Sequence, residues 1–199
     1  IPEQGPLYMW DLVTGQSKKL PILADTESIS ALSQDKTFLA IATTNGAVKL
    51  LNLKTGQIRS LINGAHSVIN LNFSFDNKFL ITVSINGTVL LWDIKTGITQ
   101  KITGTKDKII IDACCIDDST FIFAREKTKN LINLYNIQTN TTHKLTAHNA
   151  DVEQIAFLPN SKQLISNSED GTIIIWDVQT QQIAKRFKII ADNFAITPD

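Results

Sequence analysis

A histidine, two serines and an aspartate lie close together near the end of the sequence, and these residue types can do chemistry. They are His148, Ser166, Ser168 and Asp170, and hydrolases use serine, histidine and aspartate for nucleophilic attack. His66 lies 82 residues before His148, which is two periods of 41 residues, and we interpret the two histidines as equivalent positions of a repeat. The set recurs, and its serines fall within a predicted strand without a nucleophile turn or an oxyanion-binding loop. We therefore interpret the set as structural. Metal binding is disfavoured because equivalent positions of separate repeats point apart.

The repeat itself is visible in the spacing of large side chains that end apolar runs. Successive anchor residues are separated by 41, 41, 43 and 41 positions, and they are Trp10, Leu51, Trp92, Tyr135 and Trp176. Asp170-Gly171 and Asn86-Gly87 precede two of these runs, and such pairs are strong signals of a tight β-hairpin. No segment keeps a period of 3.6 residues, so the sequence predicts short strands and almost no helix.

Each unit of the repeat is interpreted as four short strands. In the last full unit, the first strand contains Val152, Ile155 and Phe157, and the next three are predicted at residues 163–168, 172–176 and 182–187. A turn separates the third and fourth strands of every unit, at Thr14-Gly15, Thr55-Gly56, Thr96-Gly97, Thr139-Asn140 and Thr180-Gln181. Because the last pair lacks glycine or asparagine, we expect a longer or differently shaped turn there.

Four-stranded units of about 40 residues that end in Trp-Asp resemble the WD-repeat (WD40-type) family. The resemblance covers essentially the whole chain, and its most specific copies are residues 66–93 and 148–177. It implies an all-β fold, a β-propeller of four-stranded antiparallel blades, with about four complete blades and partial N- and C-terminal blades. The blades expected from it are residues 1–20 (partial), 21–62, 63–104, 105–146, 147–188 and 189–199 (partial). We expect this chain to be a segment of a longer propeller of six to eight blades.

The resemblance also implies a role for the histidines. In the family, a histidine, a serine or threonine, an aspartate and a tryptophan of one blade form a hydrogen-bonded tetrad. Carried over to this sequence, the tetrads are His148, Ser168, Asp170 and Trp176, with Ser166 as the alternative to Ser168, and His66, Ser84, Asn86 and Trp92, with Thr82 as the alternative to Ser84. Buried indole and imidazole groups need such partners, because an unpaired buried polar group costs more than a hydrogen bond contributes.

Composition argues against several classes of partner. Lys and Arg together number 19, as do Asp and Glu, so no global charge favours nucleic acid or anionic lipid. No apolar run reaches the roughly 18 residues that span a bilayer. Cofactor-binding motifs such as the phosphate-binding glycine loops are absent, and we expect no cofactor and no metal. Cys114 and Cys115 are adjacent and cannot join distant segments, which favours a reducing, cytoplasmic location.

These observations predict a non-catalytic protein–protein interaction scaffold rather than an enzyme. The alternative is a propeller enzyme or a small-molecule sensor that uses the central funnel. By resemblance, two loops of the fourth unit share one face of the propeller, and their basic residues are the candidate partner-binding face: Lys106, Lys108, Arg125, Lys127 and Lys129. Such a face suits an acidic or phosphorylated peptide, although a merely solvated hairpin would have the same composition.

Overall fold

The computed structural model describes residues 4–25, 28–43, 46–63, 66–103, 112–115, 120–124, 130–158 and 161–188. In these ranges the regular structure consists of β-strands. The first two strands, β1 (Gln4–Trp10) and β2 (Ser17–Asp25), pair with each other as an antiparallel hairpin, which we call blade 1. The rest of the described chain forms four sheets of four strands each.

Each of these sheets is antiparallel and connected in chain order, and we call them blades 2 to 5. Blades 2 and 3 consist of β3 (Ile29–Leu32), β4 (Phe38–Ala42), β5 (Ala47–Asn52) and β6 (Ile58–Asn63), and of β7 (Val68–Phe73), β8 (Phe79–Ser84), β9 (Val89–Asp93) and β10 (Thr99–Thr103). Blades 4 and 5 consist of β11 (Asp112–Cys115), β12 (Thr120–Ala124), β13 (Leu131–Asn136) and β14 (Thr141–Thr146), and of β15 (Val152–Leu158), β16 (Gln163–Ser168), β17 (Thr172–Asp177) and β18 (Gln182–Lys188).

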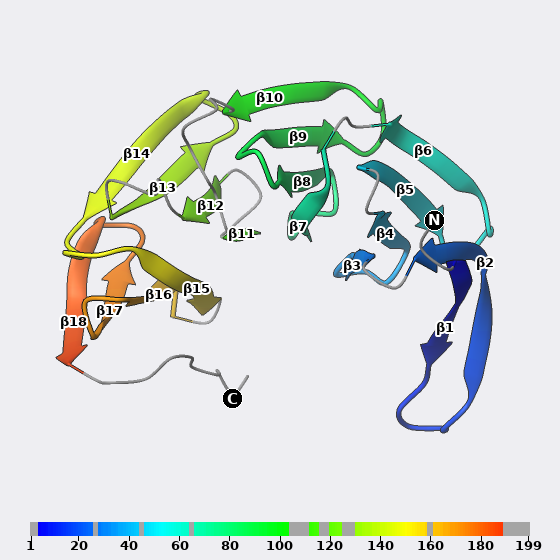
Figure 1. Ribbon diagram of the computed structural model, residues 1–199, viewed down its shortest axis with the longest axis horizontal. Helices are drawn as coiled ribbons and strands as arrows, with labels where there is room; N and C mark the ends of the chain where they lie inside the picture. Colours follow the sequence, from blue (N-terminus) through cyan, green and yellow to red (C-terminus); the bar gives the residue numbers. More distant parts are fainter. Residues whose placement is uncertain are drawn as a thin grey trace.

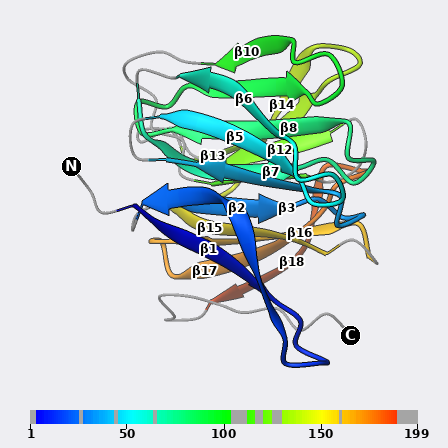
Figure 2. The same ribbon diagram turned by 90° about the vertical axis from the view of Figure 1, so that its right-hand side faces the viewer.

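The blades stand side by side in an arc (Figure 1). The first strands β3, β7, β11 and β15 lie on the inner side, the last strands β6, β10, β14 and β18 lie on the outer side, and the inner strands of neighbouring blades are in contact. The described sheets do not close into a ring, since the arc is open between blade 1 and blade 5. Figure 2 shows that the β1–β2 hairpin extends away from the row of blades.

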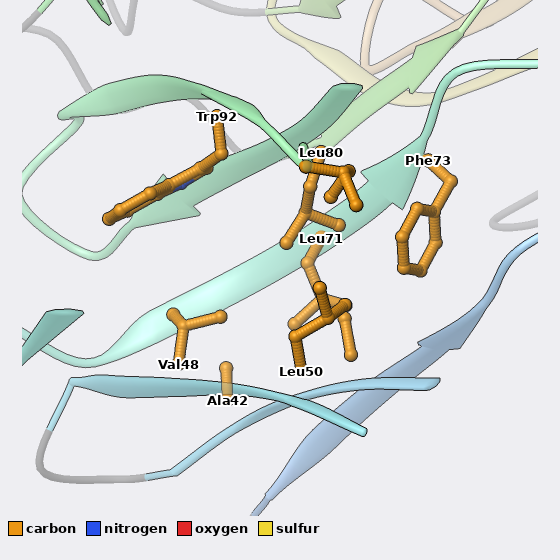
Figure 3. Packing of buried hydrophobic residues seen from close by; sticks show 9 residues of the cluster. Ala42, Val48, Leu50, Leu71, Phe73, Leu80 and Trp92 are labelled. Carbon is orange, nitrogen blue, oxygen red and sulfur yellow. The ribbon is translucent and has the colours of Figure 1, made fainter. Parts of the chain in front are cut away.

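The hydrophobic core is divided among the interfaces between blades. Figure 3 shows one of them, where side chains of blade 2 face side chains of blade 3; the labelled residues are Ala42, Val48, Leu50, Leu71, Phe73, Leu80 and Trp92. Blade 1 packs on blade 2 in the same way, through Leu20 and Ile22 of β2 against Leu39, Ile41 and Leu51. Each large side chain buried in this way contributes about 1.5–3 kcal/mol, so the blades stabilise one another as well as themselves.

The prediction of four-stranded units with almost no helix is confirmed in the described residues. The strand β16 has the predicted bounds, β17 and β18 each end one residue later than predicted, and β15 contains the three residues predicted for the first strand. Blade 1 has longer strands than expected, since β2 runs to Asp25 and so continues beyond the boundary predicted after residue 20. The partial strand predicted at residues 189–199 lies outside the described residues.

The prediction of a different turn at Thr180-Gln181 is wrong. Gln181 has φ 60°, which is the conformation of Asn140 (φ 54°) and of Gly15, Gly56 and Gly97 (φ 69–75°) in the sibling turns. The reason is the residue that ends the third strand. In all five turns it lies four residues before the positive φ, and its Oδ1 accepts a hydrogen bond from the backbone; these residues are Asp11, Asn52, Asp93, Asn136 and Asp177.

Candidate functional site

The residues of blade 5 that could do chemistry form one buried chain of hydrogen bonds. The Trp176 indole Nε1–H donates to Ser166 Oγ at 2.8 Å, and Ser166 Oγ lies 2.7 Å from His148 Nε2. On the other side of the ring, Nδ1 is 3.1 Å from Thr172 Oγ1 and 3.3 Å from Asp170 Oδ2. Because the indole can only donate, Ser166 accepts from it and donates its own hydrogen to Nε2. This order places the histidine hydrogen on Nδ1, facing the carboxylate.

The electrostatics agree with a neutral imidazole next to an ionised carboxylate. Burial lowers the pKa of His148 below its usual 6.5, and this outweighs the opposing effect of Asp170. Burial by itself would raise the pKa of Asp170, but its hydrogen bonds lower that pKa from 3.8 to about 2. The bonds come from Thr172 Oγ1 and N at 2.6 and 2.9 Å and from Asn149 N at 2.8 Å. Near neutral pH, the network therefore carries one negative charge, on Asp170.

The network joins two loops on the same face of blade 5. Asp170, in the β16–β17 turn, accepts the backbone hydrogen of Asn149, which lies in the loop before β15. Ser168 Oγ donates to the carbonyl of Ala150 in that loop at 3.0 Å. A backbone hydrogen bond from Glu169 N to Asp151 O, at 3.0 Å, adds a third connection. The residues that could do chemistry thus hold surface loops in one arrangement.

The same geometry argues against nucleophilic catalysis by this serine. Ser166 lies in the middle of β16 and is 0% exposed, and the Trp176 indole covers its oxygen. A nucleophile must reach the substrate carbonyl, with donors placed for the developing oxyanion. Ser166 offers neither, so its contact with His148 serves to pair buried polar groups.

The structure distinguishes the two hydroxyls that the sequence left open in each blade. The serine that bonds Trp176 and His148 is Ser166 rather than Ser168, whose oxygen accepts from Asp170 N at 3.2 Å. In blade 3, the Trp92 indole likewise donates to Thr82 Oγ1, at 3.1 Å, rather than to Ser84.

His66 of blade 3 does not occupy the position that His148 has in blade 5. His66 is exposed, and within the described part of the chain no hydrogen bond joins it to Thr82, Ser84 or Asn86. The interpretation of His66 and His148 as equivalent is therefore wrong. The two histidines are 82 residues apart, but Trp92 and Trp176 are 84 apart, so His66 is two residues too close to its tryptophan to take the same place. Asn86 Oδ1 accepts from Thr88 N at 3.1 Å within the turn.

The aspartate of the Trp-Asp pair has a role that the sequence reasoning missed. Asp11 Oδ1 accepts from Val13 N at 2.8 Å and Thr14 N at 3.0 Å, and Asn52 Oδ1 accepts from Lys54 N and Thr55 N at 2.9 and 3.0 Å. Hydrogen bonds from the turn backbone lower the pKa of Asp11, Asp93 and Asp177. An amide oxygen accepts the same bonds, which is why asparagine replaces aspartate in two units. The signal was present in the sequence, as Asp or Asn always four residues before the turn residue.

The five basic residues of the candidate partner-binding face, Lys106, Lys108, Arg125, Lys127 and Lys129, lie outside the described residues, and their arrangement stays a prediction. Within the described ranges, no group of three or more His, Cys, Asp or Glu side chains is placed to hold a metal ion. A search of the same ranges for a helix long and apolar enough to cross a membrane finds none.

An arc of four-stranded antiparallel sheets, packed face to face with their first strands innermost, defines this chain as part of a β-propeller. The family model described as "WD domain, G-beta repeat" matches residues 56–93 and 139–177. Two WD repeats are thus matched within the chain, and its fold is that of WD40 β-propellers, as expected from the sequence.

Several known proteins are similar to it. The "Target of rapamycin complex subunit LST8" of Saccharomyces cerevisiae is 32% identical over 60 residues, which are 29% of this chain and 20% of that protein. A chain in a crystal structure of the Mitotic Checkpoint Complex aligns with a TM-score of 0.78 at 18% identity, over 94% of this chain and 59% of that one.

Two further solved propellers have a similar fold. The Cps50 (Swd1) β-propeller domain of Myceliophteria thermophila has a TM-score of 0.69 at 18% identity, over 83% of this chain and 58% of that one. The C-terminal WD40 domain of Sif2 has a TM-score of 0.68 at 22% identity, over 86% of this chain and 50% of that one. This chain therefore spans between 50% and 59% of these three solved chains.

Proposed function

We propose that this chain is the propeller part of a non-catalytic scaffold that presents the loops of its blade faces to partner proteins. The observation that carries the proposal is that His148, Ser166 and Asp170 bond to one another and to backbone groups of the protein. Their hydrogen bonds lie inside blade 5 and fix the loop before β15 against the β16–β17 turn. Loops held in one arrangement lose little conformational entropy when a partner binds, which favours affinity.

The names of similar proteins support the same proposal. LST8 is named as a subunit of the Target of rapamycin complex, and one of the similar chains comes from the Mitotic Checkpoint Complex. Both names place a protein similar to this chain in a multiprotein assembly. Protein partners are accordingly the class that we propose for this chain, in a cytoplasmic location.

The finer proposal concerns the basic residues of blade 4. Lys106, Lys108, Arg125, Lys127 and Lys129 would attract an acidic or phosphorylated peptide, and Arg125 would supply a bidentate fork to a carboxylate or phosphate. Charges at the rim of an interface act mainly on the association rate, and salt screens them. Partner association through these residues should therefore slow as ionic strength rises.

Affinity purification of the intact protein with quantitative mass spectrometry tests the proposal. The test variant changes Lys106, Lys108, Arg125 and Lys127 to Glu, and a control of equal charge changes four exposed lysines of the outer strands, Lys18, Lys19, Lys144 and Lys185, to Glu. We expect the parent and the control to enrich the same partners and the test variant to lose at least one. Partners that the test variant retains in full would overturn the role of the basic residues. No enriched partner at all would overturn the scaffold and favour a small ligand in the central funnel.

A further inference from the structure

A cavity of about 570 Å³ lies between blades 2 and 3. Residues from the β5–β6, β7–β8 and β9–β10 turns and the strand ends next to them line it. It is therefore at the end of the blades opposite to the loops that the His148 network joins. Its volume is within the ~300–1,000 Å³ range that is usual for ligand sites.

Arg59 marks one wall of this cavity and crosses the gap between the blades. It belongs to β6 of blade 2, and its guanidinium donates to the carbonyl oxygens of Ile94 and, at 3.4 Å, of Lys95 in blade 3. Carbonyls orient the guanidinium without neutralising it, so its positive charge remains at the cavity wall. A guanidinium has five N–H donors, and those not used by the two carbonyls can serve a ligand.

The interface of blades 3 and 4 has a neutral contact in place of this charged one. Gln100 of β10 lies 41 residues after Arg59 and makes the equivalent contact from blade 3 to blade 4. Its Nε2 donates to Tyr135 Oη at 3.0 Å and to Asn140 Oδ1 at 3.1 Å. Tyr135 Oη in turn donates to Asn140 Oδ1 at 2.8 Å. The later interface is thus joined by neutral groups that satisfy one another.

Positive charge exceeds negative charge around the cavity. Arg59, Lys78 and Lys95 line it, against the single carboxylate of Asp93. Lys78 forms an ion pair with Asp76 at 2.8 Å, and Asp93 Oδ1 accepts from Thr96 N at 2.7 Å in its own turn. Neither hydrogen bond removes the charge of Asp93, which also attracts Lys95, so the five charged groups leave one net positive charge at the cavity, and Arg59 and Lys95 supply it from opposite sides of the gap between the blades.

The other lining groups are suited to a polypeptide. Phe38, Leu50 and Ile94 provide an apolar wall. Gln57 and Asn77 add side-chain amides, and Asn77 uses its oxygen to accept from Gln34 N at 2.8 Å. This use of the oxygen directs the amide N–H₂ group to acceptors such as main-chain carbonyls.

We propose that this cavity binds an extended peptide segment of a partner protein that has a carboxylate side chain next to an apolar one. The carboxylate lies between Arg59 and Lys95, the apolar side chain packs on Phe38 and Ile94, and Gln57 and Asn77 bind the peptide backbone. The inference rests on the proposed scaffold function, and it adds a docking site at the end of the blades opposite to the loops that the His148 network joins.

Selection from a phage-displayed library of random heptapeptides on the intact protein tests the proposal. The matched pair of variants is Lys95→Glu and Lys54→Glu. Lys54 lies in the same position of its own turn, 41 residues earlier, but does not line the cavity. We expect enriched peptides to contain Asp or Glu beside an apolar residue. By fluorescence anisotropy, we expect these peptides to bind Lys95→Glu at least tenfold more weakly than the parent, because a hydrogen bond to a charged group is lost. They should bind Lys54→Glu as tightly as they bind the parent.

Lys95 is in an exposed turn, so Lys95→Glu should keep the fold. Arg59→Gln is the second variant, with circular dichroism as its folding control.

Several results would overturn the proposal. Peptides without an acidic residue, or acidic peptides that Lys95→Glu and Lys54→Glu bind equally, exclude the cavity as the site. If such peptides are instead lost on changing Lys106, Lys108, Arg125 and Lys127 to Glu, the scaffold function stands and only the cavity proposal fails. If inorganic phosphate or acetate displaces a bound acidic peptide at the same concentration of anionic groups as an unlabelled acidic peptide does, the cavity is an anion site and not a peptide site. An empty selection also overturns the cavity proposal, whereas the scaffold is judged separately by its purified partners.

Discussion

Ser166 bonds Trp176 because of its position in the register between β16 and β17. Trp176 stands directly opposite Leu164, and Ser166 is two residues further along β16, on the same face and diagonally across from the indole. Ser168 is four residues from Leu164 and pairs with Thr172 instead. Blade 3 has the same register, with Trp92 opposite Leu80 and Thr82 two residues on. A hydroxyl two residues along the neighbouring strand from the residue opposite the tryptophan is within reach of the indole, and one four residues along is not.

Replacing Ser166 with alanine should destabilise the protein by about 2–4 kcal/mol. The change leaves the Trp176 N–H and the His148 Nε2 unpaired in the interior, and each unsatisfied buried group costs about 1–3 kcal/mol. Ser166→Thr is the matched control, because Thr82 performs the same role for Trp92, and it should lose less. Urea denaturation of the three proteins measures the difference. Equal stability of the alanine and threonine variants would contradict the role of the hydroxyl.

Asp170 should make stability depend on pH in strongly acidic solution. Its pKa is lowered from 3.8 to about 2 in the folded protein, so its contribution is complete above pH 3.8 and is lost as pH falls towards 2. The shift corresponds to about 2 kcal/mol. We expect the stability difference between the parent and Asp170→Asn to shrink over this range in thermal denaturation scans.

Asp177→Asn is the control for that measurement. Asparagine stands at the corresponding turn position in two sibling units, as Asn52 and Asn136. This variant should therefore be close to the parent above pH 4. Below that pH its difference from the parent should change less than that of Asp170→Asn, because the pKa of Asp177 is lowered less than that of Asp170. A difference between the parent and Asp170→Asn that is constant from pH 4 to pH 2 would contradict the assignment of the charge to Asp170.

At the residue scale, the sequence predicted the kinds of residue in the network but not every member. Alternation along a strand places Ser166 and Ser168 on one face, so periodicity cannot choose between them; only the register can. The place of His66 was misjudged because the 43-residue step between Trp92 and Tyr135 shifts every later position by two. His66 and His148 are two periods of 41 residues apart, and they therefore appear to be equivalent positions although they are not.

The turns between third and fourth strands are shaped by the residue before them. An Asp or Asn side chain accepts backbone hydrogens of the turn and sets its length, and the fourth residue after it takes a positive φ. Where that residue is Gln181, the left-handed conformation costs about 1–2 kcal/mol relative to a residue without Cβ.

Gln181→Gly should therefore stabilise the protein by about 1 kcal/mol. Part of the relief is offset because glycine increases the freedom of the unfolded chain. The reverse change, Gly56→Ala, should cost about 1 kcal/mol; no heavy atom lies within 4 Å of an added Cβ, so backbone strain alone acts there. Chemical denaturation measures both, and a destabilised Gln181→Gly would contradict the shared turn geometry.

Strand positions were predictable at the element scale because alternation and turn residues both mark them. The shape of the Gln181 turn was not predictable from Gln181 itself, because the capping side chain of Asp177 sets it.

The β1–β2 hairpin leaves large apolar side chains exposed. Among the described strands, β1 pairs with β2 alone, whereas every other third strand lies between two neighbours. Trp10 is 64% exposed, while Trp92 and Trp176, its counterparts in blades 3 and 5, are 1% and 3% exposed. Leu12 and Val13 at the hairpin turn are 95% exposed. A strand with a free edge and an exposed apolar face is a ready surface for further strands.

Trp10 reports on the prediction that this chain is a segment of a longer propeller. In the 199-residue chain, its fluorescence should be accessible to acrylamide, and subtraction of the Trp10→Phe spectrum isolates its signal. If further strands of the intact protein pair with β1, quenching of Trp10 should fall severalfold there. Equal quenching in both would contradict the prediction of a completed blade.

At the scale of the whole molecule, the period and the four-strand unit were sufficient to predict propeller blades. The cavity between blades 2 and 3 was not predictable, because it depends on which side chain crosses each interface. Arg59 and Gln100 occupy equivalent positions, yet one contacts backbone carbonyls beside a cavity and the other closes a set of neutral hydrogen bonds.

Native mass spectrometry of the intact protein, purified gently from its own cells, tests the central claim most directly. The scaffold account predicts species that contain the protein together with one or more other polypeptides, dissociating as ionic strength rises. A protein that is found only by itself, or only with a bound small molecule, would contradict the account and favour a sensor or an enzyme that uses the central funnel.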